Sequence, residues 1–258
     1  MKPKVTILKI GGKIIDDEHA LTSFLTLIAA RESKTILVHG GGKTATALAT
    51  KLGVETKMRD GRRITDLDTL KIVTMVYAGL INKTIVARLQ ALNVDALGLT
   101  GADMNIIHAH RRIADTIDYG YVGDPDTTNA RRLTTLLKEG ITPVIAPITH
   151  DGHGTLLNTN ADTIAATIAI SLAPSYDVTL TYCFEKPGVM LNPNDNNTLI
   201  PHINHTLYQT LLNNHTITTG MLPKLHNAFE ALKKGVTQVI ITSPEHINTQ
   251  STGTIIEL

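Results

Sequence analysis

The sequence of 258 residues contains no tryptophan, only three phenylalanines and a single cysteine, Cys183. With so few aromatic side chains it lacks the stacking platforms on which single-stranded nucleic acids bind. One cysteine excludes a disulfide framework and a Cys-x-x-Cys zinc site. Lysine and arginine together number 24 and aspartate and glutamate 23, so the formal net charge of +1 provides no basic field for nucleic acid. We therefore expect no nucleic-acid partner.

The sequence also has little that suggests a membrane. No apolar run approaches the roughly 20 residues of a membrane-spanning helix. The apolar run at residues 5–10 is too short for a signal peptide, and no cleavage site follows it. We expect a cytoplasmic globular protein with small-molecule substrates and no membrane partner, long enough for one large domain or two modest ones.

Short β-branched runs alternate with longer segments of helical periodicity. This alternation predicts an α/β fold, a three-layer αβα sandwich with a mainly parallel central sheet. The predicted strands are residues 4–10, 35–39, 94–98, 142–146, 177–180 and 236–242. The predicted helices are residues 20–31, 44–52, 66–90, 127–138, 161–172, 207–213 and 220–234, and hairpins are predicted at 57–65, 106–121 and 147–158. The turn at 173–175 divides the chain into an amino-terminal lobe, 1–173, and a carboxy-terminal lobe, 174–258.

Glycine clusters follow the first two predicted strands, at residues 9–13 (KIGGK) and 39–43 (HGGGK). In open α/β sheets, ligands bind beyond the carboxyl ends of the strands, where bare backbone N–H groups can approach an anion. One cluster alone is consistent with a tight turn, but two at equivalent strand ends favour a phosphate or carboxylate site. Lys9 ends a predicted buried strand, and burying a lysine is costly unless its ammonium group reaches a polar site.

The second cluster also resembles three shorter motifs. A P-loop would need glycine at position 37, which is Leu37. The esterase oxyanion loop is excluded because no Gly-x-Ser-x-Gly elbow exists. Gly40, Gly42 and Ala45 fit a dinucleotide-binding fingerprint, so an oxidoreductase remains an alternative.

Polar residues gather at three further positions. The segment 158–162 (NTNAD) joins a strand to a helix, where it serves as a helix cap or faces a ligand. Arg63 is either a solvated hairpin charge or a fork for a carboxylate. Lys224 lies near a predicted helix N-terminus, which disfavours a cation unless an anion is bound.

Metal-ligand spacing is absent from the sequence. The two His-x-x-His pairs, at 150/153 and 202/205, have no third partner at a typical spacing, so we expect no protein-held metal. Cys183 follows a buried strand and is interpreted as inert core.

Taken in order, six motifs resemble the amino acid kinase family over essentially the whole chain. They are KIGGK (9–13), HGGGK (39–43), GRRIT (61–65), GLTGADMNII (98–107), NTNADT (158–163) and TTGMLPKL (218–225). The last two motifs point to the branch that acts on N-acylated glutamate. The resemblance implies phosphorylation of the side-chain carboxylate of N-acetyl-L-glutamate by ATP in arginine biosynthesis, with Mg²⁺ carried by the nucleotide. N-succinylglutamate as acceptor, and a non-catalytic amino-acid sensor on the same fold, remain alternatives.

The same resemblance implies a role for each matching residue. Lys9 and Lys224 would stabilise the transferring phosphoryl group, and Asp162 would organise both lysines. In the amino-terminal lobe, Arg63 would hold the α-carboxylate and Asn158 the acylated end. Gly41 and Gly42 would offer N–H groups to the substrate. The phosphate and nucleotide contacts implied are Gly11, Gly12, Glu185, Lys186, Pro187, Gly188, Val189, Met190, Thr216, Ile217 and Thr218.

Two further expectations concern acyl preference and assembly. A succinyl group would need an extra cation near the acyl end, with Lys57, Arg62 and Arg112 in suitable loops. Relatives inhibited by arginine have an additional amino-terminal helix that links dimers into a hexamer, whereas here three residues precede the first predicted strand. We therefore expect a homodimer insensitive to arginine. The apolar helical stretch 66–90 either supplies part of its interface or is buried within the chain.

Overall fold

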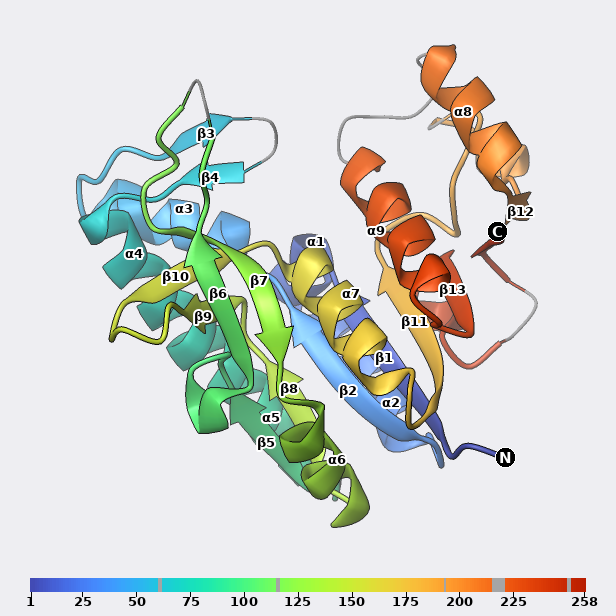
Figure 1. Ribbon diagram of the computed structural model, residues 1–258, viewed down its shortest axis with the longest axis horizontal. Coiled ribbons are helices and arrows are strands. Elements are labelled where there is room, and N and C mark those ends of the chain that lie inside the picture. Colours follow the sequence, from blue (N-terminus) through green and yellow to red (C-terminus); the bar gives the residue numbers. More distant parts are fainter. Residues whose placement is uncertain (60–61, 115–116, 193, 215–220, 250–251) are drawn as a thin grey trace.

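An eight-stranded sheet runs through the computed structural model, which describes residues 1–59, 62–114, 117–192, 194–214, 221–249 and 252–258. Its strands, in order across the sheet, are β12 (His202–Ile203), β14 (Thr254–Ile256), β13 (Gln238–Thr242), β11 (Asp177–Cys183), β1 (Lys4–Ile10), β2 (Lys34–His39), β8 (Thr142–Ile145) and β5 (Ala96–Leu99). Every neighbouring pair is parallel except β13 and β14. Helices cover both faces (Figure 1), which confirms the predicted α/β sandwich.

All six predicted strands lie in this sheet. Strand β1 has the predicted bounds, whereas β5 begins two residues later than expected and β11 continues to Cys183. The sequence did not predict β12 and β14, because strands of two and three residues are too short to show an alternating pattern.

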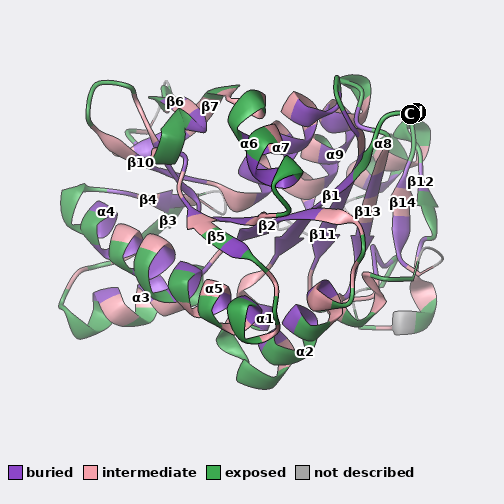
Figure 2. Cartoon of the chain, turned by 90° about the horizontal axis from the view of Figure 1, so that it is seen from below, coloured by how far each residue is buried: buried purple, intermediate pink, exposed green. Residues whose placement is uncertain are grey.

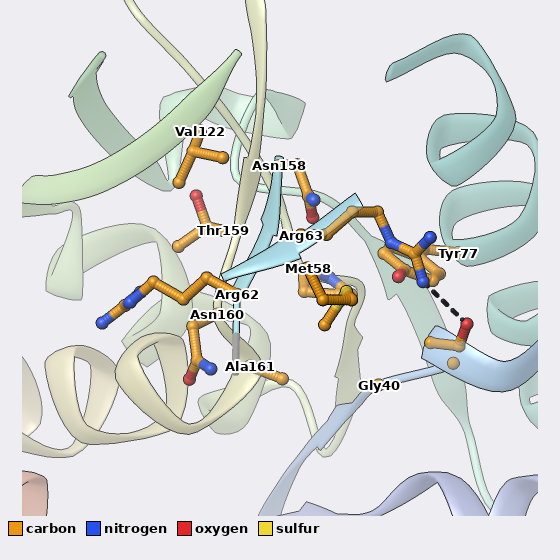
Figure 3. Close-up of a pocket in the computed structure, with 13 residues that line it drawn as sticks. Gly40, Met58, Arg62, Arg63, Tyr77, Val122, Asn158, Thr159, Asn160 and Ala161 are labelled. Carbon is orange, nitrogen blue, oxygen red and sulfur yellow. Dashed lines mark hydrogen bonds between the residues drawn. The ribbon is translucent and has the colours of Figure 1, made fainter. Parts of the chain in front are cut away.

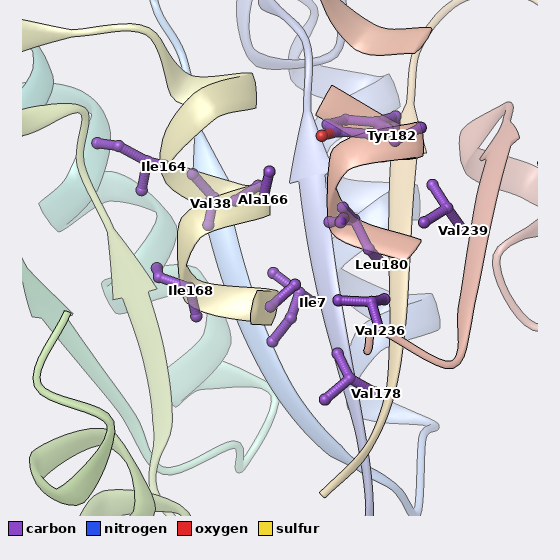
Figure 4. Close-up of a cluster of buried hydrophobic side chains, with 14 of the residues drawn as sticks. Ile7, Val38, Ile164, Ala166, Ile168, Val178, Leu180, Tyr182, Val236 and Val239 are labelled. Atoms are coloured by element: carbon purple, nitrogen blue, oxygen red, sulfur yellow. The ribbon is translucent and has the colours of Figure 1, made fainter. Parts of the chain in front are cut away.

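The alternation along β1 divides the core into two clusters on opposite faces of the sheet. Val5 and Ile7 pack in one cluster with α7 (Ala161–Leu172) and α9 (Leu222–Lys233), as Figure 4 shows for Ile7. Leu8 and Ile10 pack in the other with α2 (Glu18–Ala29) and α5 (Asn82–Ala91). Figure 2 shows the buried strands between the two helical layers. Because side chains alternate along a strand, Lys9 lies on the same face as Val5 and Ile7, toward α7 and α9.

The predicted helix at 66–90 is one long helical segment with an irregular centre. It consists of α4 (Leu67–Thr74), the π-helix η1 (Met75–Ile81) and α5. Contrary to the expectation from the sequence, Leu67–Ala91 is long and apolar enough to cross a membrane, by length and composition alone. Leu70, Val73, Ile85 and Leu89 are buried in the second core cluster, and this packing accounts for its apolar character.

The remaining helices are short. They are α1 (Gly12–Asp16), α3 (Gly42–Lys51), α6 (Ala130–Lys138), α8 (His205–Asn213) and the 3₁₀ turns η2 (Asp103–Asn105), η3 (Asn196–Thr198) and η4 (Pro244–His246). Helix α6 begins three residues later than predicted, because the Asn129 side chain accepts a hydrogen bond from the Arg132 N–H and so acts as its N-cap.

Two small β structures lie beyond the carboxyl ends of β2 and β8 (Figure 1). Strands β3 (Lys57–Arg59) and β4 (Arg62–Ile64) form the predicted hairpin, whose tip lies outside the described residues. Strands β6 (Ile107–Arg111), β7 (Val122–Thr128), β9 (Ile148–His150) and β10 (Leu156–Thr159) close into a four-stranded unit. The hairpin predicted at 106–121 was placed too early, because its return strand is β7.

Candidate active site

Three elements bring two lysines to one buried aspartate. Lys9 lies near the end of β1, Asp162 in the first turn of α7, and Lys224 in the first turn of α9. The Lys9 Nζ lies 2.7 Å from Asp162 Oδ1, and the Lys224 Nζ lies 2.8 Å from Asp162 Oδ2. The side chains of Lys9, Asp162 and Lys224 are 10%, 7% and 15% exposed. Each carboxylate oxygen therefore holds one ammonium group, and the cluster has one positive charge in excess.

The start of α7 fixes Asp162 in place. The Asn160 side chain accepts hydrogen bonds from the backbone N–H groups of Asp162 and Thr163 at 2.9 and 3.1 Å. Asn160 is therefore the helix cap that its position in the sequence suggested. Burial by itself would raise the pKa of Asp162, but Lys9 and Lys224 hold it at about 2. Desolvation lowers the pKa of Lys9 against the attraction of Asp162, and the nearby Lys224 charge lowers it further.

A cavity of about 190 Å³ opens at the start of α7, the helix that contains Asp162 (Figure 3). Its lining includes the sequence candidates Gly41, Gly42, Arg63 and Asn158. The other residues around it are Gly40, Met58, Arg62, Tyr77, Val122, Pro147, Thr159, Asn160 and Ala161. Asn160 and Ala161 connect the cavity to the aspartate cluster, because they directly precede Asp162 in the chain.

Arg63 is held rigidly at the cavity wall. It is buried, and one terminal nitrogen donates to the Gly42 carbonyl at 2.9 Å and to Thr46 Oγ1 at 2.8 Å. The other terminal nitrogen donates to Thr56 Oγ1 at 3.1 Å. Neutral oxygens therefore orient the guanidinium group without cancelling its charge. The Asn158 amide is fixed in a similar way, by donating to Thr65 Oγ1 at 3.0 Å.

The glycine loop after β2 is shaped by its neighbours. Gly41 has a φ of +149°, and a Cβ there would overlap the Ile81 side chain and lie 3.1 Å from the Tyr77 ring. Both neighbours belong to the π-helix η1, a geometry that is frequent at functional sites. Sequence reasoning missed Tyr77, because no spacing rule predicts a π-turn inside a helical pattern.

His39 anchors the same loop from the core. The Asn82 side chain donates to its Nε2 at 3.1 Å and to the Val144 carbonyl at 2.9 Å. The Nδ1 atom, 2.8 Å from the Gly40 carbonyl, is therefore the protonated donor of a neutral ring. Complete burial lowers the pKa of His39 to about 4.

The residues expected to contact nucleotide lie away from the cavity lining. Gly11 and Gly12 follow β1, and the Glu185 carboxylate pairs with Lys13 Nζ at 2.8 Å on the surface. Lys186 and Pro187 are half-buried, and Gly188, Val189 and Met190 are buried. The Val189 N–H donates to Thr254 Oγ1 at 2.8 Å, which joins this loop to β14. Thr216, Ile217 and Thr218 lie outside the described residues.

Other reactive side chains form no second centre in the described part of the chain. Groups of three or more His, Cys, Asp or Glu side chains suited to a metal ion are absent from the residues that the structure describes. Cys183 is buried, and burial raises the pKa of its thiol to about 12. A thiol in this environment stays protonated and unreactive.

Comparison with known proteins gives consistent matches over the full length. The sequence model of the amino acid kinase family matches residues 4–243. The chain is 52% identical over 257 residues to the acetylglutamate kinase of Phocaeicola vulgatus, covering 100% of both chains. It is 52% identical over 249 residues to the acetylglutamate kinase of Bacteroides fragilis, covering 96% of this chain and 95% of that one. The crystal structure of smu.665 from Streptococcus mutans superposes with a TM-score of 0.82 at 28% identity, covering 98% of each chain.

Proposed function

The chain belongs to the amino acid kinase family, and we propose that it transfers the terminal phosphoryl group of ATP to the side-chain carboxylate of N-acetyl-L-glutamate. The observation that carries this function is the buried Lys9–Asp162–Lys224 cluster beside a cavity that contains a fixed arginine. The full-length similarity to acetylglutamate kinases supports the same acceptor and a place in amino-acid biosynthesis.

The chemistry requires charge stabilisation rather than a general base. A glutamate side chain has a pKa near 4.3 and is already an ionised nucleophile at neutral pH. Phosphoryl transfer spreads negative charge over the equatorial oxygens, so the chain must mainly position two anions and stabilise that charge. Lys9 and Lys224 supply two cations, and Asp162 keeps both side chains in place while its own charge cancels only one of them.

We assign the acceptor to the cavity in the amino-terminal lobe. Arg63 binds the α-carboxylate, since neutral oxygens orient its guanidinium group at the cavity wall and leave its positive charge for an anion. Asn158 contacts the acylated amide, and the backbone of Gly41 and Gly42 lies against the reacting end. The carboxy-terminal lobe, residues 174–258, holds the nucleotide with the loop 185–190 and with residues 216–218, and Gly11 and Gly12 contact its phosphates.

The nucleotide brings Mg²⁺ with it in this proposal. When bound, the ion neutralises charge on the phosphates. The excess positive charge of the lysine cluster fits the polyphosphate. No protein-held ion is needed for that arrangement, and a kinase of this type works in the cytoplasm, where its ATP is.

We also assign the protein a homodimeric state. Leu67, Met75 and Leu80 expose more than half of their surface along the helical segment 67–91. A neighbouring apolar hollow contains Leu67, Met75 and Tyr121. Pairing of this face with itself would cover these side chains, as symmetric dimers commonly do.

An ATP-dependent assay with hydroxylamine tests the function, because hydroxylamine traps acyl phosphates as hydroxamates. We expect hydroxamate from N-acetyl-L-glutamate, and little from free glutamate, whose charged amine replaces the neutral amide next to Asn158. A lack of ATP-dependent product with every acyl-glutamate would refute the assignment. Similarity to acetylglutamate kinases favours this reading over the oxidoreductase and the sensor, and an NAD-induced rise in Tm without one for ATP would reverse that preference.

A further inference from the structure

The acceptor cavity has a second arginine opposite Arg63. Arg62 and Arg63 are consecutive residues of β4, so their side chains leave the strand on opposite sides. Both line the same cavity. Figure 3 shows Arg63 pointing toward Gly40 and Tyr77, and Arg62 pointing the other way, past Asn160. A ligand between them would meet one guanidinium group at each end.

Two guanidinium groups, Arg62 and Arg112, lie close enough at this end of the cavity to repel each other. Arg112, which follows β6, donates to Asp124 Oδ1 at 2.5 Å and stacks over the Tyr119 ring at 5.7 Å. Its Nε is buried without a hydrogen-bond partner among the described residues. Among the described residues, Asp124 is the carboxylate that pairs with Arg112 and attracts Arg62, and Asp162 already pairs with two lysines.

Opposing effects from the described residues act on the charge of Arg62. Burial lowers the pKa of Arg62, and repulsion from Arg112 lowers it further, against the attraction of Asp124. An anion bound at this end of the cavity would favour the charged form of Arg62 against both effects. An acetyl group offers no charge there, because its methyl group is the end of the molecule.

We propose that the acyl end of the cavity binds a carboxylate, so that the preferred acceptor is a glutamate acylated by a dicarboxylic acid, such as N-succinyl-L-glutamate, with Arg62 as its partner and Arg112 in support. This inference rests on the proposed function, since the phosphorylated group and the Arg63 contact are the same for both acceptors. Of the three cations that a succinyl group could have used, the structure places Arg62 and Arg112 together. Lys57 is exposed and pairs with Glu55 at 3.4 Å.

A series of acceptors tests the proposal on the unmodified protein. The hydroxamate assay is run with N-acetyl-, N-succinyl- and N-succinamoyl-L-glutamate, the last having a neutral amide in place of the distal carboxylate. We expect kcat/KM for the succinyl compound to exceed that for the succinamoyl compound by at least about tenfold, because charge-assisted hydrogen bonds are roughly twice as strong as neutral ones. Equal values for these two would overturn the proposal.

Three variants test whether the preference for N-succinyl-L-glutamate depends on Arg62. Arg62→Gln should lower the ratio of kcat/KM for N-succinyl- over N-acetyl-L-glutamate by about tenfold or more. Arg63→Lys should leave this ratio unchanged, because the α-carboxylate is common to both acceptors. Lys57→Gln, on the same hairpin but outside the cavity, should also leave it unchanged. A ratio unaffected by Arg62→Gln, or lowered equally by Lys57→Gln, would overturn the proposal.

The set of acceptors that are phosphorylated distinguishes a failure of the acyl preference from a failure of the proposed kinase function. Phosphorylation of N-acetyl- but not N-succinyl-L-glutamate would overturn the inference and leave the function intact. Phosphorylation of neither would refute both. Calorimetric titration of each acceptor without ATP gives the same comparison as a ratio of Kd values, and there too Arg62→Gln should weaken the succinyl compound selectively.

Discussion

Two lysines four residues apart form ion pairs of nearly the same length, one buried and one exposed. Lys9 lies 2.7 Å from Asp162, and Lys13 lies 2.8 Å from Glu185. The side chains of the first pair are 10% and 7% exposed, and those of the second are 58% and 44% exposed. Distance alone would rank the two pairs as equal.

Burial makes the loss of one partner far more costly in the Lys9–Asp162 pair than in the Lys13–Glu185 pair. Removing one partner of a buried pair leaves a charge without water or counter-ion, whereas an exposed pair is screened and exchanges freely with solvent. Asp162 also pairs with Lys224, so the buried pair is part of a three-residue unit. Each lysine in this unit is held by a different oxygen of the same carboxylate. A rigid, partly desolvated pair of cations is what stabilisation of a transferring phosphoryl group requires.

The largest effect is expected from removing a lysine of the buried unit. Lys9→Ala or Lys224→Ala should lower kcat by about 10²–10⁴, the scale for losing a charge aimed at developing negative charge. Lys13→Ala is the matched control and should change kcat by less than about threefold, since its ammonium group pairs on the surface. Steady-state rates with saturating ATP measure both. Either buried-site variant retaining half of the wild-type kcat would remove that lysine from the mechanism.

The buried carboxylate provides the second test. Asp162→Asn should lower kcat by at least about 10² while leaving KM for the acceptor within about threefold, because the aspartate positions the lysines and does not touch the acceptor. It should also cost about 3–5 kcal/mol of unfolding free energy, since two buried cations lose their counter-ion. Urea unfolding and steady-state kinetics measure these effects. A rise in KM at constant kcat would show instead that Asp162 contributes to binding.

Much of the buried unit could be predicted from the sequence. The short, β-branched and largely apolar run at residues 4–10 predicted a buried strand. A lysine at its end, before two glycines, had to reach a polar site. Asn160 and Asp162 fitted a helix start, and Pro223 marked the first turn of the helix that contains Lys224. That these three elements converge on one carboxylate depends on the order of strands in the sheet, which local patterns do not encode.

The parts that were missed depend on long-range packing. Tyr77 reaches the cavity because a π-turn shifts the register of a helix whose apolar pattern looks regular. The return strand β7 pairs with β6 across a connection of ten residues, too long for a tight-turn rule to locate. Arg62 and Arg63 were both noticed in the sequence, but only the hairpin's position over the cavity shows that they serve opposite ends of it.

The pH dependence of the unfolding free energy reports on the buried groups His39 and Asp162, because their pKa values differ from those of the unfolded chain. The pKa of His39 is lowered to about 4, so the unfolded chain binds a proton there between about pH 6.5 and 4 that the folded chain does not. Stability should therefore fall as pH decreases through this window, by up to about 3 kcal/mol. The pKa of Asp162, about 2, places its contribution lower: it is fully present above about pH 4 and lost as pH falls toward 2.

A substitution at His39 tests whether this residue causes the loss of stability between about pH 6.5 and 4. His39→Gln should flatten the dependence between about pH 6.5 and 4, measured as unfolding free energy in urea at each pH, whatever its effect on absolute stability. His202→Gln is the control, because that ring is exposed beside Glu257. An unchanged slope in the His39 variant would show that another group titrates in this window.

The smallest effect is expected at the exposed pair. Partial burial would raise the pKa of Glu185, but the hydrogen bond from Lys13 at 2.8 Å helps to lower it. Exposed pairs nevertheless contribute only about 0.2–1 kcal/mol, and less at high salt. Glu185→Gln should therefore change the unfolding free energy by about 0.5 kcal/mol or less, and the change should vanish in 1 M NaCl. Because its loop is assigned to the nucleotide, KM for ATP should rise by no more than about threefold, with kcat nearly constant. A tenfold fall in kcat would mean that this carboxylate acts on the reacting phosphate through Lys13, and the two ion pairs would then differ in exposure but not in function.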